Sequence, residues 1–69
     1  MITVRDFASL ALYDERDVTL VDCRTEEELG DYIIFDVSNS EYANCKVVSF
    51  DFQYTEGLIL TIDTEERDE

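Results

Sequence analysis

The chain has 69 residues and a mass of 8.0 kDa. This length allows one domain, because two domains of this total size could not each bury a hydrophobic core. Eighteen Asp and Glu face five Lys and Arg, with no His, so the net charge is −13. This balance excludes direct binding to nucleic acid or to an anionic membrane surface, since both need basic residues. With 45% hydrophobic residues, the chain is nevertheless expected to fold.

Two features of the sequence bear on location. No stretch approaches the roughly 20 apolar residues of a membrane-spanning helix. The start, MITVRDFASL, lacks the basic region and long apolar core of a signal peptide. We therefore expect a cytoplasmic protein without a membrane partner.

The N-terminal segment predicts a helix. Thr3 and Asp6 have the spacing of a capping box, and Ile2 and Phe7 occupy the positions of a hydrophobic staple. The helix should therefore begin at Val4 and run for about ten or eleven residues. Its apolar face recurs at helical spacing and consists of Val4, Phe7, Ala8, Leu10 and Ala11.

Two strands are predicted in the middle of the chain. Residues 18–23 (VTLVDC) and 31–37 (DYIIFDV) are short and rich in β-branched residues. Between them, the acidic segment 24–30 ends in Gly30 and indicates a loop or helical turn that closes a hairpin. Residues 38–44 are expected to form a loop or a single helical turn, with Tyr42 pointing inward.

A second hairpin follows near the C-terminus. Residues 45–54 and 58–63 are strand-like, and the connection 55–57 offers Gly57 for a positive φ. The first strand leaves two faces open, either Val18 and Leu20 or the alternate set from Thr19 to Cys23. Period-two alternation assigns the other strands' core residues as Ile33, Phe35, Val37, Val48, Phe50, Phe52, Tyr54, Leu58, Leu60 and Ile62.

These elements predict an α+β fold: one N-terminal helix packed on a four-stranded, mainly antiparallel sheet made of two hairpins. Residues 1–64 would form a single domain, and residues 65–69 an acidic C-terminal tail. Strand order stays open because two hairpins can pair in more than one way.

The acids inside the strands need an explanation. Alternation places Asp36, Asp51 and Asp63 on the helix-free face of the sheet, with Tyr32, Ile34 and Ile59 as apolar or aromatic islands. Two unit charges about 5 Å apart repel by roughly 0.8 kcal/mol even in water. A domain this small supplies only a few kcal/mol of stability, so we expect a role in binding to maintain these acids.

Catalytic apparatus is missing from the sequence. The chain has no His, no G-x-S-x-G elbow and no Gly-rich phosphate loop, so neither an enzyme nor a cofactor is expected. Cys23 and Cys45 are too few for a zinc site and are expected to act as small hydrophobic residues, a disulfide being unusual in a reducing cytosol. Residues 26–31 (EEELGD) are a candidate cation-binding segment, although no EF-hand spacing occurs.

Several short motifs resemble a known set of proteins. The opening TVRDF, the pair Glu41 and Tyr42, the strand V-x-S-F-D from Val47 to Asp51 and the terminal aliphatic strand are similar to small acidic proteins encoded by bacterial phages and prophages. Some proteins of this kind are anti-CRISPR proteins or other DNA mimics, such as the uracil-DNA glycosylase inhibitor. They block a nucleic-acid-binding enzyme by occupying its basic groove. The resemblance implies such an inhibitor in the bacterial host cytosol, with a CRISPR nuclease as one possible partner.

The charge pattern suggests how such a protein would bind. A groove that holds DNA is lined with Arg and Lys, and Arg grips carboxylates in bidentate fashion as it grips phosphate. The acidic tail, with Glu65, Glu66, Asp68 and Glu69, would add a diffuse field. The predicted contact residues are Asp36, Asp51 and Asp63, then Glu26, Glu27, Glu28 and Asp31, with Tyr32, Ile34 and Ile59 as anchors.

Two other hypotheses also explain the acidic composition. In the first, the chain is a non-enzymatic phage accessory or assembly module, for which a homodimer through a sheet edge is one expected form. It would also fit a cation-binding domain or one from a salt-rich cytosol, which carries many Asp and Glu and few Lys.

Overall fold

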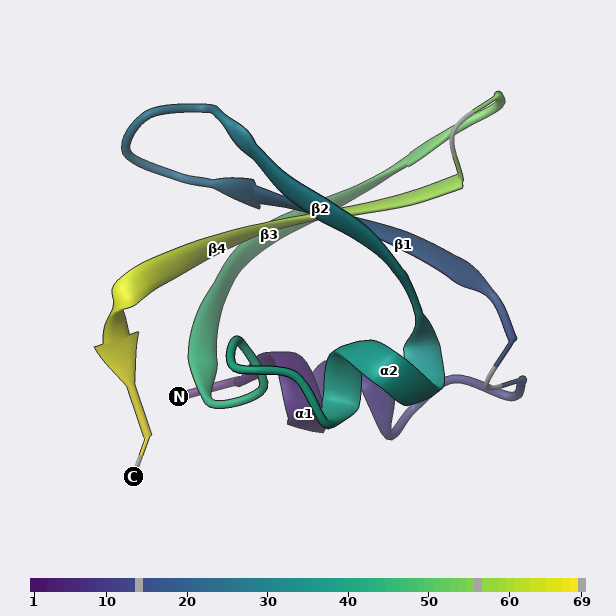
Figure 1. Cartoon of the computed structure of the whole chain (residues 1–69), viewed down its shortest axis with the longest axis horizontal. Helices are drawn as coiled ribbons and strands as arrows, with labels where there is room; N and C mark the ends of the chain where they lie inside the picture. The colour runs from purple at the N-terminus through teal and green to yellow at the C-terminus, as the bar shows by residue number, and fades with distance from the viewer. Residues whose placement is uncertain (14, 56, 69) are drawn as a thin grey trace.

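The computed structural model describes residues 1–13, 15–55 and 57–68 and has an α+β fold. A four-stranded sheet forms one layer, and two short helices lie together on one of its faces (Figure 1). The elements in chain order are α1 (Val4–Ala8), β1 (Asp17–Asp22), β2 (Glu28–Ile33), α2 (Ile34–Ser38), β3 (Cys45–Gln53) and β4 (Gly57–Arg67).

The sheet contains both predicted hairpins, but it is mixed. Its strand order is β2-β1-β4-β3, with β1–β2 and β3–β4 antiparallel and the central pair β1–β4 parallel. The prediction of a mainly antiparallel sheet is therefore corrected at its centre. The physical reason is that α2 and residues 39–44 carry the chain beneath the sheet, so the second hairpin joins the first with β4 beside β1.

The predicted turn between β3 and β4 is supported by its glycine. Gly57 has a φ of +77°, a conformation that glycine adopts without steric cost. The connection also contains Glu56, which lies outside the described residues, as does Glu69 of the predicted tail. β4 continues to Arg67, three residues into the segment that the sequence suggested as a tail.

The capping box of α1 is confirmed, but the helix is shorter than predicted. The Thr3 hydroxyl accepts the Asp6 N–H at 3.1 Å, and the Asp6 carboxylate accepts the Thr3 N–H at 3.1 Å. The helix has five residues, because the N–H groups of Leu10 and Ala11 bond to Phe7 and Ala8, three residues back. Leu10 consequently leaves the apolar face and is 80% exposed.

The predicted strand 31–37 is wrong beyond Ile33. The chain turns into α2, which buries Ile34 and Val37 at a spacing of three residues, whereas Ile33 and Phe35 are exposed. Side chains in the following polar run stabilise this turn. The Ser38 hydroxyl and the Asn39 amide both donate to the Phe35 carbonyl, at 2.9 and 3.0 Å.

The core lies between the central strands and the helices. Val18 faces Leu58 and Leu20 faces Leu60, so the open question about β1 resolves to the Val18 and Leu20 face. Tyr42 packs against this core, as predicted. The buried hydrophobic residues are Val4, Ala8, Val18, Leu20, Ile34, Val37, Ala43, Cys45, Leu58, Leu60 and Ile62.

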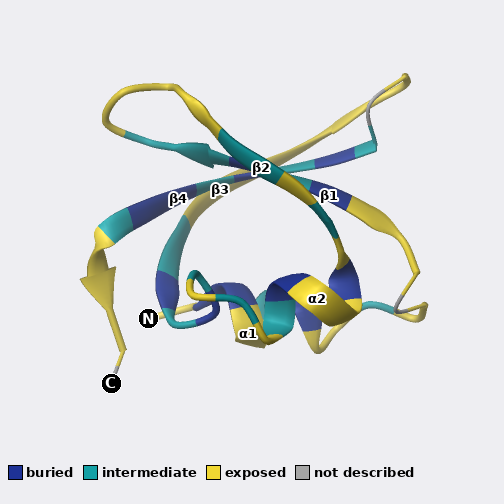
Figure 2. Cartoon of the chain, in the orientation of Figure 1, coloured by how far each residue is buried: buried dark blue, intermediate teal, exposed yellow. Residues whose placement is uncertain are grey.

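The aromatic residues of β3 are not part of that core. Alternation predicted that Val48, Phe50, Phe52 and Tyr54 would be covered by the helix, yet all four are exposed, Phe52 to 72%. Phe50 does touch Phe7 of α1, with ring centroids 5.3 Å apart. The reason is geometric, since β3 is an edge strand and five-residue helices do not reach across it (Figure 2).

Truncating a central core residue should unfold a large fraction of the molecules. We expect Leu60→Ala to lower the free energy of unfolding by about 2–5 kcal/mol, because Leu60 is fully buried between β1, β3 and the helices. Urea denaturation followed by circular dichroism measures this loss. The control Tyr54→Ala, at a fully exposed residue that lines neither groove, should change it by less than about 0.5 kcal/mol. Equal losses in the two variants would contradict this account of the core.

Candidate functional site

The face of the sheet opposite the helices carries a row of residues that the strand register defines. Asp31 of β2, Thr19 of β1, Ile59 of β4 and Asp51 of β3 lie side by side. Acids thus stand at the two edges and uncharged side chains in the middle. The Thr19 hydroxyl donates to the Asp31 carboxylate at 2.6 Å, which fixes that acid against the sheet.

Part of this surface is hollowed into a groove of about 480 Å³. Its lining is acidic at the rim and apolar or hydroxylic at the floor, and none of the described residues that line it is Lys or Arg. The lining residues are Asp17, Thr19, Val21, Glu26, Glu28, Asp31 and Ile59. We call these residues, together with Asp51 opposite Ile59, the acidic face.

Several predicted site residues lie on the acidic face. Asp31, Glu26, Glu28 and Ile59 line the groove, and Asp51 is exposed beside it. Glu27 is exposed in the connection between β1 and β2 but does not line the groove.

Sequence reasoning missed Asp17, the first residue of β1. The signal was present, since extending the strand by one residue puts Asp17 on the same face as Thr19 and Val21.

Three predicted positions are wrong. Asp36 was expected on the helix-free face but lies on α2, which covers the opposite face. Ile34, expected outward, is buried in the core with 3% exposure. Tyr32, also expected outward, packs against the core. Its ring lies so close to Gly30 that a side-chain Cβ at that position would be only 3.2 Å from it. Ile34 and Asp36 are misplaced because the strand ends at Ile33, and Tyr32, inside β2, is misplaced because its face was predicted from the residues beyond that end.

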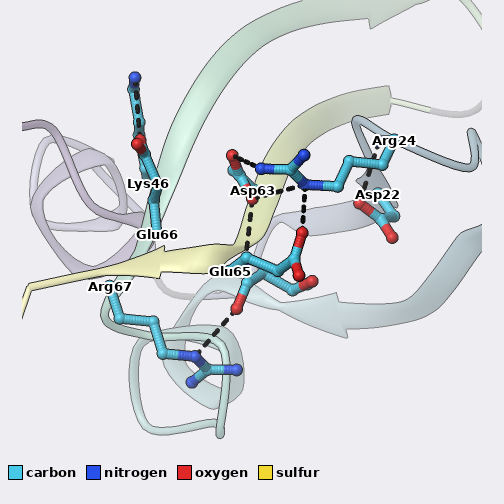
Figure 3. A network of polar contacts seen from close by, with 8 residues as sticks. Asp22, Arg24, Lys46, Asp63, Glu65, Glu66 and Arg67 are labelled. Carbon is cyan, nitrogen blue, oxygen red and sulfur yellow. Dashed lines mark hydrogen bonds and ion pairs between the residues drawn. The ribbon is translucent and has the colours of Figure 1, made fainter.

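Asp63 lies on the predicted side of β4 but is 8% exposed. Its carboxylate accepts two hydrogen bonds from the Arg24 guanidinium, at 3.0 and 3.3 Å, and one from the Glu65 N–H at 3.0 Å (Figure 3). The Glu65 N–H and the Arg24 guanidinium hold the pKa of Asp63 below its usual range, against the opposing effect of burial. This charge is bound within the protein and does not belong to the accessible part of the acidic face.

The basic residues gather elsewhere. Arg24 also contacts the Glu65 carboxylate at 2.6 Å, and Lys46 contacts the Glu66 carboxylate at 3.1 Å. Arg67 donates to the carbonyl of Glu41, at 2.8 Å.

The remaining two basic residues lie near α1 and β1. Arg5 bonds to the Asn44 side chain, and Arg16 lies over the Tyr13 ring. Each of the five cations therefore has a contact outside the acidic groove, so the charges of the chain are segregated.

Other site chemistry finds little support in the described residues. No group of three or more His, Cys, Asp or Glu converges there to hold a metal ion, which counts against a cation site at 26–31. Cys23 and Cys45 are free thiols, and burial raises the pKa of the Cys45 thiol. None of the helices in the described part of the chain has the length and apolar character needed to cross a membrane.

Comparisons with protein-family models, with curated proteins and with solved structures give no match to this chain. The fold and the surface thus define a small α+β protein with one acidic, helix-free sheet face. The resemblance to small acidic phage proteins stays a prediction.

The Arg24–Asp63 contact should make stability depend on pH in a defined direction. Because the folded pKa of Asp63 is lowered, its stabilising contribution is present above the unfolded value of about 3.9 and is lost as pH falls through the folded pKa. Asp63→Asn should therefore be less stable than the parent at pH 7, and this difference should shrink near pH 3. Urea denaturation at both pH values measures it.

The control for that measurement is Asp51→Asn. Asp51 is exposed on the same face, so its neutralisation should leave stability unchanged or slightly raised at pH 7, as like-charge repulsion falls. A stability loss in Asp63→Asn that is equal at both pH values would show that lost packing, and not the ion pair, is responsible.

Proposed function

We propose that this chain is an acidic binding protein whose acidic face occupies the basic nucleic-acid-binding groove of another protein. The observation that carries the proposal is the groove opposite the helices, which has four carboxylate residues and no basic residue in its lining. The net charge of −13 supports it, since the surrounding field has the same sign.

The sheet would present its carboxylates in a fixed arrangement. Asp31 and Asp51 stand in one row three strand spacings apart, about 14 Å at ~4.8 Å per strand. Side chains on paired strands lose less conformational entropy on binding than those of a flexible tail. Arg residues of the partner would bind the carboxylates in bidentate fashion, and Ile59 and Val21 would give an apolar contact between them.

The density of charge sets how closely this surface can imitate DNA. A six-residue strand spans about 20 Å, a length over which a duplex carries roughly 12 charges. The acidic face carries five exposed carboxylate residues: Asp17, Glu26, Glu28, Asp31 and Asp51. It would therefore engage a local cluster of Arg and Lys, while the remaining charge of the chain steers association.

The resemblance stated above narrows the kind of partner. Small acidic phage proteins that act by DNA mimicry inhibit enzymes of the bacterial host, so a nuclease of bacterial immunity, such as a CRISPR effector, is the partner we propose. In this role the chain is an inhibitor in the host cytosol and not an enzyme. Binding would exclude nucleic acid from the groove by direct competition.

The proposal is tested by capture from bacterial lysate at low salt. We expect the immobilised chain to retain basic nucleic-acid-binding proteins, identified by mass spectrometry, and added duplex DNA to release them because both ligands need one groove. Raising salt from about 0.1 M to about 1 M shortens the Debye length from about 10 Å to about 3 Å and should also release them.

A pair of charge-matched variants locates the contact. Asp17→Asn, Asp31→Asn and Asp51→Asn together should reduce capture at least about tenfold, about 0.5 kcal/mol for each lost contact with a basic side chain. Asp36→Asn, Glu41→Gln and Asp68→Asn remove the same charge from exposed sites elsewhere and should retain most of it. Equal losses in both variants, or capture that DNA does not compete with, would refute binding through the acidic face.

A second candidate function is an assembly module, and one observation favours it. β3 is an edge strand, and its aromatic residues are exposed. Edges of this kind pair readily with another chain. This function needs an apolar surface, so its binding would not weaken as salt rises.

A further inference from the structure

An apolar surface lies on the helix side of the sheet, and its groove shares only Asp17 with the acidic groove. It borders a groove of about 740 Å³ that residues 10–13 and 15–17 line on one side and residues of the β3–β4 hairpin on the other. Phe50 joins it through its contact with the Phe7 ring. We call these residues the apolar patch: Phe7, Leu10, Leu12, Tyr13, Phe50 and Phe52.

The patch is large for a chain of this size. Taking about 200 Å² for a fully exposed large side chain, the exposed fractions of its five members other than Phe7 give roughly 700 Å² of surface. The largest apolar patch on a typical monomer is about 300–600 Å². A standard interface buries about 800 Å² on each partner, of which roughly 60% is apolar. The patch can therefore supply the whole apolar part of such an interface.

Folding does not account for this exposure. The core is closed by Val4 and Ala8 of α1 and by Ile34 and Val37 of α2. Leu12 is 91% exposed, and it lies in the connection after α1, where no strand or helix requires an apolar side chain. Burial against a second molecule would give these side chains the environment that the fold does not.

The rim of the patch indicates what that second molecule is. Arg16 lines this groove next to Glu15 and Asp17, so both signs of charge meet here, unlike at the acidic groove. In a twofold symmetric pair the same patch faces itself, which lets Arg16 of one copy approach an acid of the other.

The patch also continues into an open strand edge. Residues 2–3 cover only the start of β3, through Val47 N–H to the Ile2 carbonyl and a bridge from Thr3 to Lys46.

From the area, the mixed charge and the open edge, we propose that the apolar patch is a homodimer interface, on which a second copy of this chain packs with its own patch. Apart from Asp17, the acidic face then points outward on both copies, so the inference does not rest on the proposed function. Two chains of net charge −13 repel at long range, and salt screens this repulsion while leaving apolar contact intact. The dimer should therefore tighten as salt rises, opposite to binding by the acidic face.

Light scattering on the full chain tests the inference. At about 100 µM protein, we expect the mass to move from 8.0 kDa towards twice that value as salt rises from about 0.1 M to about 1 M. Leu12→Ser should weaken dimerisation about tenfold or more, because it removes most of the transfer free energy of one leucine side chain. Phe52→Ser tests the other wall of the groove and should act in the same direction.

The matched control is Phe35→Ser, at an apolar residue of α2 that is 56% exposed and does not line the groove. It should dimerise as the parent does. A monomer at both salt concentrations, a dimer that weakens with salt, or equal weakening by Phe35→Ser and Leu12→Ser would overturn the proposal. Leu12→Ser retains every carboxylate, so capture of basic proteins by this variant reports on the acidic face alone.

Discussion

The structure depends on how little of the sheet two short helices can cover. α1 and α2 have five residues each, and both lie on one face, where they meet the central strands β1 and β4. Leu20 and Leu60 are fully buried beneath them. A chain of this mass is expected to expose about 4,500 Å² when folded, and this one exposes 4803 Å². The sheet face opposite the helices and the helix side of β3 account for where that exposure falls.

The two uncovered regions have different chemistry because alternation gives each strand two kinds of side chain. On β3 the helix side carries Phe50 and Phe52, and the other side carries Ser49 and Asp51. Longer helices would have buried the aromatic residues and left only the acidic face. Their shortness instead produces an apolar patch on one side of the same edge strand and a carboxylate on the other. The two interfaces proposed for these regions would respond to salt in opposite directions.

What could be predicted from the sequence follows from the range of each interaction. The capping box at Thr3 and the β3–β4 hairpin are local, and both were predicted correctly. The parallel pairing of β1 with β4 joins residues 40 positions apart, as in Val18 with Leu58, and nothing in local alternation reveals it. The end of β2 at Ile33 depends on hydrogen bonds to the Phe35 carbonyl from Ser38 and Asn39. That boundary removes Ile34 and Asp36 from the strand, and it also invalidates the alternation over residues 33–37 from which the face of Tyr32 was predicted.

In the candidate site too, features set by local sequence were predicted correctly and features set by distant contacts were not. Asp31 and Asp51 were placed on the correct face because their strands alternate regularly across that region. Asp63 was judged accessible because Arg24, 39 residues away, gave no local signal of the contact.

The positions of the few basic residues explain how the C-terminal end of β4, which carries several acids, can fold despite the repulsion between them. Arg24 and Lys46 contact three acids of β4, namely Asp63, Glu65 and Glu66. Arg67 caps a carbonyl of the loop before β3, so it ties the end of β4 to the helix layer. If these cations were spread evenly, they would neutralise part of the acidic groove and leave the end of β4 to repel itself. Because they are concentrated there, they stabilise the fold and leave the groove lining without a basic residue, which is the arrangement that the proposed binding would need.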